Sequence, residues 1–255
     1  MDIQDVKKAI SKYSRKVVVP LLTSAMVLLA GNEVDAKRTV VNPNANDHVV
    51  FYIPHQDDEA LTFGVSIMNH IKAGYQVHVV LLTDGSASFV RKRLDMTPAE
   101  FTEARNAEFA LSLKALGVKA SNVEYKGYKD SELTVAQVEK VIKSYEAKYP
   151  NANHKTFSYT DKDNHDHSNA GIALKNVQKA KITDDARYYV RRGDNPKGIR
   201  LISEKYYTEY NNKAKAVSKA YSVVDEDKGL HGIGRKSVKK SFEAFDEQPL
   251  SRYHK

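Results

Sequence analysis

The sequence predicts one α/β domain, a Rossmann-like three-layer sandwich whose sheet is mostly parallel. Apolar, strand-like runs alternate with segments of helical periodicity from residue 49 to about residue 221, an order that implies parallel strands joined by right-handed crossovers. The run Gln76–Thr83 is almost continuously apolar, as expected of a strand buried on both faces. With 255 residues the chain is long enough for one large core, and no repeat or linker marks a second domain after residue 48.

The expected elements have local signals at their ends. The first strand, 49–53, leads through Pro54 into a helix over 59–73 that ends at a glycine. A later helix begins at Thr97, with a threonine cap and a proline in its first turn, and stops at Gly117. The other expected elements are strands at 76–83, 123–125, 156–159, 188–191 and 198–202 and helices at 131–148, 169–180 and 205–221, before glycine-rich turns close the chain.

Residues 1–36 have the layout of a secretory signal peptide. A basic region precedes the apolar run Val17–Ala30, and Val34-Asp35-Ala36 offers small residues at the −3 and −1 positions of a cleavage site. The run is short for a membrane span of roughly 20 residues, and no cysteine is present to carry a lipid anchor. We therefore expect a secreted protein with a linker at 37–47 and a folded domain at 48–255; a retained N-terminal anchor is the alternative.

The chain is basic, and its charge bounds the partners to expect. The formal net charge is +8, and it is +7 without residues 1–36, which hold five basic and four acidic residues. Such a secreted protein is attracted to anionic cell-wall polymers or membrane surfaces, although the lysines could equally form an ordinary solvated surface. No nucleic-acid motif occurs, and nothing indicates an obligate protein partner. Zero cysteines exclude disulfides, thiolate zinc ligands and a cysteine nucleophile.

One histidine and three acids follow the first expected strand, at the edge of an α/β sheet where ligands bind. His55 offers an imidazole and Asp58 a hard oxygen ligand, which together suit zinc. Neighbouring side chains on a tight turn diverge, so Asp57 could stay off the metal and still reach a metal-bound water. The alternative is that Asp58 and Glu59 are first-turn carboxylates that favour the helix dipole.

The stretch Pro54-His55-Gln56-Asp57-Asp58-Glu59 resembles the Pro-His-x-Asp-Asp-Glu signature of the PIG-L/LmbE-like zinc N-deacetylases. The resemblance extends from about Val49 to about Leu174, and weaker similarity continues towards the C-terminus. It implies that residues 48–255 form a deacetylase domain that acts on N-acetylglucosamine-type sugars, free or as part of a glycan or glycolipid.

A second cluster, Tyr159 to Gly171, also follows an expected strand and opens an expected helix. The family's downstream motif reads His-x-Asp-His, with a glycine four residues later. Aligned on His167 and Gly171, this sequence matches the last histidine, which the resemblance makes the third metal ligand. The first histidine of the motif, which the family uses to stabilise the oxyanion, falls at Asn164, with His165 one place further on. We expect His165 to take that role; the alternatives are donation by Asn164 or loss of the role.

The cluster has two other readings. A solvated, acid-rich loop would also contain these histidines. Asp161, Asp163 and Asp166 suggest a calcium loop, but the EF-hand spacing of glycine and glutamate is absent.

Two further residues are candidates for substrate binding. Arg105 and Glu108 lie three apart on one helix face, either as a surface ion pair or, by the resemblance, with Arg105 reaching sugar hydroxyls. Asp84 ends the second strand and is either a turn former or part of the site wall. Asp130, after the third strand, has the same two readings.

The residues and the resemblance together predict metal-assisted hydrolysis of an acetamide. His55, Asp58 and His167 would hold zinc, although iron or manganese also suits two histidines and a carboxylate. Asp57 would be the base, and His165 would stabilise the oxyanion. The alternatives are an amidohydrolase for another acyl amide or a peptide, a non-catalytic metal-stabilised carbohydrate- or wall-binding protein, and a nucleotide-binding protein. The nucleotide-binding alternative is disfavoured, because this sequence lacks the Gly-x-Gly-x-x-Gly motif.

Overall fold

The computed structural model describes residues 47–255, which belong to one compact unit. The predicted signal peptide, residues 1–36, and all but the last residue of the predicted linker lie outside the described residues. Among the described helices, none combines the length and apolar character that crossing a membrane requires.

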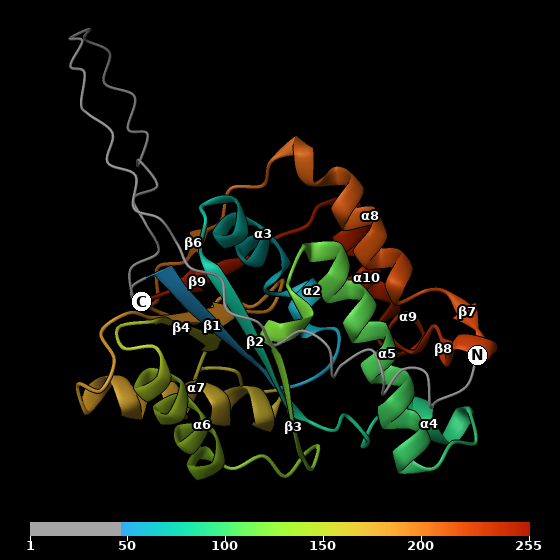
Figure 1. Cartoon of the computed structure of the whole chain (residues 1–255), viewed down its shortest axis with the longest axis horizontal. Coiled ribbons are helices and arrows are strands. Elements are labelled where there is room, and N and C mark those ends of the chain that lie inside the picture. Colours follow the sequence, from blue (N-terminus) through green and yellow to red (C-terminus); the bar gives the residue numbers. More distant parts are fainter. Residues whose placement is uncertain (1–46) are drawn as a thin grey trace, which may run out of the picture. The chain divides into compact units, whose positions relative to one another are not determined.

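A seven-stranded sheet with the order β3-β2-β1-β4-β5-β9-β6 forms the centre of the fold (Figure 1). Its first five strands in the chain are parallel, and the last two are antiparallel to their neighbours. The strands are β1 (His48–Ile53), β2 (Gln76–Thr83), β3 (Val123–Tyr128), β4 (Asn153–Phe157), β5 (Ala186–Val190), β6 (Ile202–Ser203) and β9 (Arg252–His254). The predicted α/β class with a mostly parallel sheet is confirmed.

Helices cover both faces of the sheet. On one face lie α6 (Val135–Lys148) and α7 (His165–Lys179), and on the other lie α3 (Gly64–Lys72), α5 (Pro98–Leu116), α8 (Asn211–Ala220) and α10 (Lys239–Glu247) (Figure 1). The shorter elements are α2 (Asp58–Leu61), α4 (Val90–Arg93), α9 (Ile233–Ser237), the hairpin β7 (Val224–Asp225) and β8 (Leu230–His231), and 3₁₀ turns at Ala120–Asn122, Thr208–Tyr210 and Glu226–Lys228.

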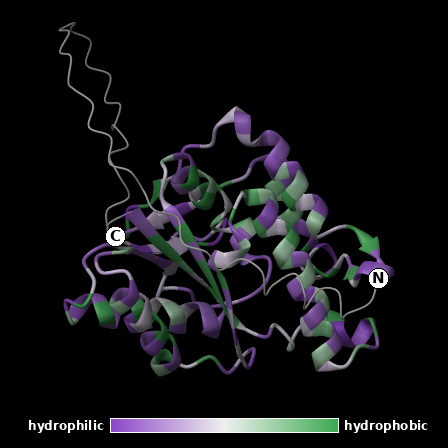
Figure 2. Ribbon diagram, in the orientation of Figure 1, coloured by the Kyte–Doolittle hydropathy of each residue, from purple (hydrophilic) through white to green (hydrophobic). Residues whose placement is uncertain are grey.

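The core explains why the central strands are apolar at consecutive positions. Along β1, Val50 and Tyr52 pack under α6 and α7, whereas Phe51 and Ile53 pack on the opposite face, and all four are fully buried. Figure 2 shows hydrophobic residues along the central strands, whereas the surrounding helices carry both colours. This is the pattern expected of a sheet covered on two faces by helices with one buried side.

Several predicted boundaries hold. The strand predicted at 76–83 is β2, and the helix from Thr97 to Gly117 is α5. Thr97 and Glu100 form a reciprocal capping box, and Gly117 adopts φ 99°, the left-handed conformation that favours glycine.

Other predicted elements differ in the structure. The single helix expected at 59–73 is two helices, because the chain turns more widely at Thr62 and Phe63, both of whose N–H groups donate to the carbonyl of Asp58. α7 begins at His165 rather than at residue 169, because the side chain of Asn164 caps it and accepts from the His167 N–H at 3.2 Å. At the C-terminus, β9, α9 and α10 lie where only turns were expected; β9 has three residues, too few for a recognisable alternation.

Lys155 is a buried cation on β4, and it provides a test of the fold. It shares its face with Phe157, two residues on, and is 3% exposed. Burial lowers the pKa of Lys155 to about 8, although the nearby Asp185 raises it. Lys155→Met is therefore expected to increase the free energy of unfolding at pH 7. The increase is up to about 3 kcal/mol, the free energy that corresponds to lowering a lysine pKa from 10.5 to about 8.

The pH dependence of that gain follows from the direction of the pKa change. Below pH 8 the folded and unfolded chains both carry the proton, so the full penalty is present. Above pH 8 the folded chain loses the proton first, and the penalty disappears as the pH passes the ordinary lysine value of 10.5. Urea unfolding of parent and variant at pH 7 and pH 10.5 measures both effects. A variant no more stable than the parent at pH 7 would contradict the prediction.

Candidate active site

The candidate site lies at the point where the strand order of the sheet reverses. β1 pairs with β2 on one side and with β4 on the other. His55 follows β1, and His167 lies in the first turn of the helix after β4. Loops at such a switch point diverge and leave a crevice for ligands, so residues 112 positions apart in the chain meet there.

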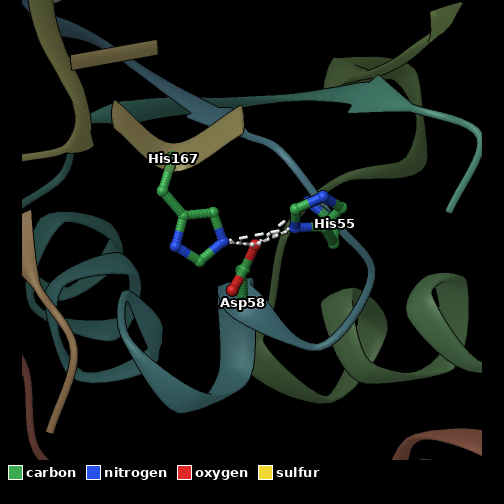
Figure 3. A group of neighbouring side chains, drawn as sticks. All are labelled: His55, Asp58 and His167. Atoms are coloured by element: carbon green, nitrogen blue, oxygen red, sulfur yellow. Dashed lines mark hydrogen bonds and ion pairs between the residues drawn. The ribbon is translucent and has the colours of Figure 1, made fainter. Parts of the chain in front are cut away.

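His55, Asp58 and His167 direct one ligand atom each at a common point (Figure 3). His55 Nδ1 lies 3.2 Å from His167 Nε2 and 3.4 Å from Asp58 Oδ2, and His167 Nε2 lies 3.2 Å from Asp58 Oδ2. Ligand atoms around a tetrahedral zinc, with bonds of about 2.0–2.1 Å, are separated by about 3.3 Å. The donor set and its spacing therefore fit a divalent ion with an open fourth position.

Each imidazole is held from behind by a carboxylate. His55 Nε2 lies 3.1 Å from Asp166 Oδ2, and His167 Nδ1 lies 3.1 Å from Asp161 Oδ2. The ring of His167 also stacks on Phe157, with centroids 3.7 Å apart. Such partners fix the orientation and tautomer of a metal-binding histidine and raise its basicity.

A second group, His55 with Asp130 and Asp166, is close enough to be considered for a metal. However, Asp166 already accepts hydrogen bonds from the N–H groups of Ser131 and Leu133, at 2.8 and 3.2 Å. The second group also uses His55, which already belongs to the first group. We therefore assign Asp166 to the support of His55.

Electrostatics favour a cation at this point. Burial lowers the pKa of His55, but hydrogen bonds to Asp130, Asp166 and Asp58 outweigh it and raise the pKa well above its ordinary value. The surrounding carboxylates therefore attract positive charge, which protons supply when no metal is bound. A metal would displace those protons, because only neutral imidazoles coordinate.

Asp57 stands beside the three ligands in an unusual conformation. Its φ of 102° is left-handed, a region that few non-glycine residues adopt. Arg105 Nη2 lies 3.3 Å from Asp57 Oδ2, and the Asp57 N–H donates to Glu59 Oε2 at 3.0 Å. Burial raises the pKa of Asp57 to about 7, although Arg105 lowers it. A carboxyl with such a pKa is suited to general-base work at neutral pH.

Glu59 is fully buried and connects the site to the C-terminal part of the chain. Its Oε1 accepts from the hydroxyl of Tyr221 at 2.6 Å, while Oε2 accepts from the Asp57 N–H. Burial raises the pKa of Glu59 to about 8. These roles of Glu59 and Tyr221 were not predicted from the sequence, and no local pattern marks Tyr221, because the contact spans 162 positions.

A cavity of about 760 Å³ opens over these groups. His55, Asp57, Asp58 and His167 form one wall. The remaining walls include Phe89, Asp130, Asp163, Asn164, Arg191, Arg192, Ser237, Lys240 and Ser241. The volume suits a small molecule or the end of a longer one.

The structure does not bring His165 into this cavity. Its side chain is exposed, and Asn164 lines the cavity instead. The reason is the early start of α7: residues 164 and 167 lie three apart, on one side of the helix, whereas residue 165 points elsewhere. The structure therefore places Asn164, and not His165, in the cavity lining.

Asp84 and Arg105 both support loops, but only Arg105 lines the cavity. Asp84 does not line the cavity; its Oδ1 accepts from the N–H groups of Ser86 and Asp130, at 2.9 and 3.1 Å. Of the two alternatives for Asp84, this placement favours that of a turn former.

Arg105 lines the cavity but is buried, and it donates to the carbonyls of Gly85 and Gln56, at 2.8 and 2.5 Å, as well as to Asp57. A Cβ at Gly85 would lie 2.6 Å from Arg105 Nη1, so the glycine makes room for the guanidinium. Arg105 thus orients Asp57, and its contact with substrate stays a prediction.

Comparisons with known proteins agree with this geometry. Residues 50–178 match the family described as GlcNAc-PI de-N-acetylase. The sequence has no significant match among curated proteins.

Several solved structures share the fold. A diacetylchitobiose deacetylase from Pyrococcus horikoshii, complexed with its inhibitor, is 16% identical, with 78% of this chain and 76% of that chain covered and a TM-score of 0.55. A triple mutant of the deacetylase Orf2 of the teicoplanin biosynthetic pathway is 18% identical, with coverages of 77% and 88% and a TM-score of 0.58. The 4-carboxy-2-hydroxymuconate hydratase GalB from Pseudomonas putida KT2440 is 17% identical, with coverages of 81% and 94% and a TM-score of 0.54.

At such identities the structures establish the fold alone, and they include a hydratase. The family match carries more, because it spans just over half of the chain and contains both metal-ligand segments. The chain therefore belongs to the PIG-L family, the GlcNAc-PI de-N-acetylases, and is a deacetylase-type hydrolase.

Proposed function

We propose that this protein is a secreted, zinc-dependent N-deacetylase that releases acetate from an N-acetylglucosamine-type amide. The observation that carries the proposal is the convergence of three ligand atoms, 3.2–3.4 Å apart, beside an aspartate outside the ligand set. His55, Asp58 and His167 would hold the ion, which would supply Lewis acidity to the water and the amide carbonyl. Secretion rests on the signal-peptide pattern in residues 1–36.

The protein's own groups account for the proton transfers. Asp57 accepts a proton from the attacking water and later delivers it to the leaving amine. Arg105 and Glu59 hold Asp57 in place, through its carboxylate and its N–H. The products are acetate and a free amino sugar.

Asn164 takes the place in the cavity that the sequence had suggested for His165. Its Oδ1 caps α7, and none of residues 47–255 accepts a hydrogen bond from its Nδ2. That amide is therefore available to donate to the developing oxyanion, a contact whose loss costs about 10²–10³ in kcat in other hydrolases.

The proposal is tested by metal analysis of the purified chain and by acetate release from a panel of N-acetylated sugars and acetyl-lysine peptides. We expect release from sugars, loss of activity with a chelator, and recovery when zinc is returned. A metal-loaded protein that binds wall polysaccharide but releases no acetate would instead favour a non-catalytic binding protein. Release from peptides alone would identify another amidohydrolase.

The two candidate oxyanion donors are separated by a pair of variants. His165→Ala is expected to change kcat/KM by less than about twofold, because the side chain is exposed and outside the cavity. Asn164→Ser keeps an oxygen that can cap α7 but removes the amide, and it is expected to lower kcat by at least about tenfold. Steady-state acetate release measures both. A larger loss of activity in His165→Ala than in Asn164→Ser would assign the oxyanion role to His165.

A further inference from the structure

One wall of the cavity is built by residues outside the family match. The match ends at residue 178, whereas this wall comes from the loop after β5, from the end of α9 and from α10. It faces the same cavity as the candidate metal ligands. The family match therefore does not describe the side chains of this wall. The wall is positioned to contact the part of the substrate beyond the acetamide.

Two cations of this wall have no acidic partner. None of the described carboxylates, residues 47–255, lies within 4 Å of the charged groups of Arg192 and Lys240. Both side chains are exposed to the cavity mouth. Ser237 and Ser241 add hydroxyl groups to the same wall.

Two acids that line the cavity are already paired with another cation. Asp163 and Asp194 line the cavity, and both pair with Arg191, at 2.8 and 3.3 Å. Arg191 also contacts Asp161, at 3.0 Å. Asp163 and Asp194 are therefore engaged with Arg191 and form no ion pair with Arg192.

The surroundings of Arg192 make this excess of positive charge larger. Its guanidinium donates to the carbonyl of Gln248, which carries no charge. Burial lowers the pKa of Arg192, and the neighbouring Arg252 lowers it further, although Glu247 raises it. Within residues 47–255, Arg252 in turn donates only to uncharged oxygens, among them the carbonyls of Arg191 and Asp194.

We propose that Arg192 and Lys240 form a subsite for an oxyanion, a phosphoryl or carboxylate group that the amino sugar carries in addition to its acetamide. The inference rests on the proposed deacetylase function and narrows its substrate class. Charge-assisted hydrogen bonds from a guanidinium and an ammonium are among the stronger polar contacts.

The test measures binding of amino sugars that are already deacetylated, so that it does not depend on turnover. Isothermal titration of the metal-loaded full chain compares glucosamine with glucosamine 1-phosphate, glucosamine 6-phosphate and muramic acid. At least one anionic sugar is expected to bind about tenfold more tightly than glucosamine. The two phosphates and the carboxylate distinguish the sources of the oxyanion.

The double variant Arg192→Gln/Lys240→Gln is expected to remove most of that preference and leave the binding of glucosamine unchanged. Lys239→Gln is the matched control, since Lys239 neighbours Lys240 but lies 3.7 Å from Glu243 and outside the cavity. The preference should also weaken as salt rises. Equal binding of all four sugars, or a preference that survives in the double variant, would overturn the subsite.

Failure of the subsite and failure of the enzyme can be told apart. If acetate is released from N-acetylglucosamine but the charged sugars gain nothing, the subsite is refuted and the deacetylase function stands. If no N-acetylated sugar is hydrolysed but the double variant abolishes the preference for anionic sugars, the subsite stands and the proposed reaction falls.

Discussion

Asp57→Asn is expected to lower kcat by about 10²–10⁴-fold, the usual contribution of a positioned acid–base group, while the bound metal stays at the parental level. Asparagine keeps the shape of the side chain and tolerates the left-handed φ of 102°, so the fold and the ligand triad should persist. The amide cannot accept the proton from water. Acetate release and metal content, measured on the same preparation, test both halves of the prediction.

Asp95→Asn is the matched control, because Asp95 also has a positive φ, of 52°, but is exposed and does not line the cavity. It should retain parental activity. If Asp57→Asn hydrolysed substrate at the parental rate, the base assignment would be wrong.

The pH profile adds a second readout for Asp57. A base works only when deprotonated, so activity is lost as the pH falls through its pKa, which burial raises to about 7. A bound divalent cation favours the carboxylate, and the acid limb should therefore lie at or below pH 7. The residual activity of Asp57→Asn should lack this limb.

His167→Ala is expected to lose both metal and activity. Removing one of three protein ligands leaves two, and the buried Asp58 carboxylate would face the ion with His55 alone. We expect the metal content to fall from about one equivalent to near zero and activity to fall by at least about 10³-fold, because the Lewis acid is lost. Plasma emission analysis and acetate release measure the two effects.

His165→Ala is the control for this variant, since it removes an exposed imidazole from the same turn of α7. A His167→Ala protein that kept a full equivalent of metal would show that the ion binds elsewhere.

The local part of the site could be predicted from the sequence, whereas its three-dimensional part could not. His55, Asp57 and Asp58 follow a strand within five residues, so strand, turn and helix fix their neighbourhood. The meeting with His167 could also be predicted, because the carboxyl ends of parallel strands share one edge of the sheet. Which side of α7 faces the cavity depends on its first residue, and an error of four residues there misplaced His165.

The long-range contacts had no signature in the chain. Arg105 could be placed on a helix, but its acceptors lie on two loops, at Gly85 and Gln56. The wall formed by Ser237, Lys240 and Ser241 was missed because α10 has nine residues and no side-chain cap, so it resembles a polar turn.

The clamped backbone of Asp57 has a consequence for the energetics of turnover. The peptide is held in an unfavourable conformation by an arginine from α5 and by a glutamate that is itself held by Tyr221. The strain, on the order of 1–3 kcal/mol, is accepted once, when the chain folds. In the proposed reaction, each catalytic cycle would then begin with a preorganised base, and little reorganisation energy would remain to be supplied when a substrate arrives.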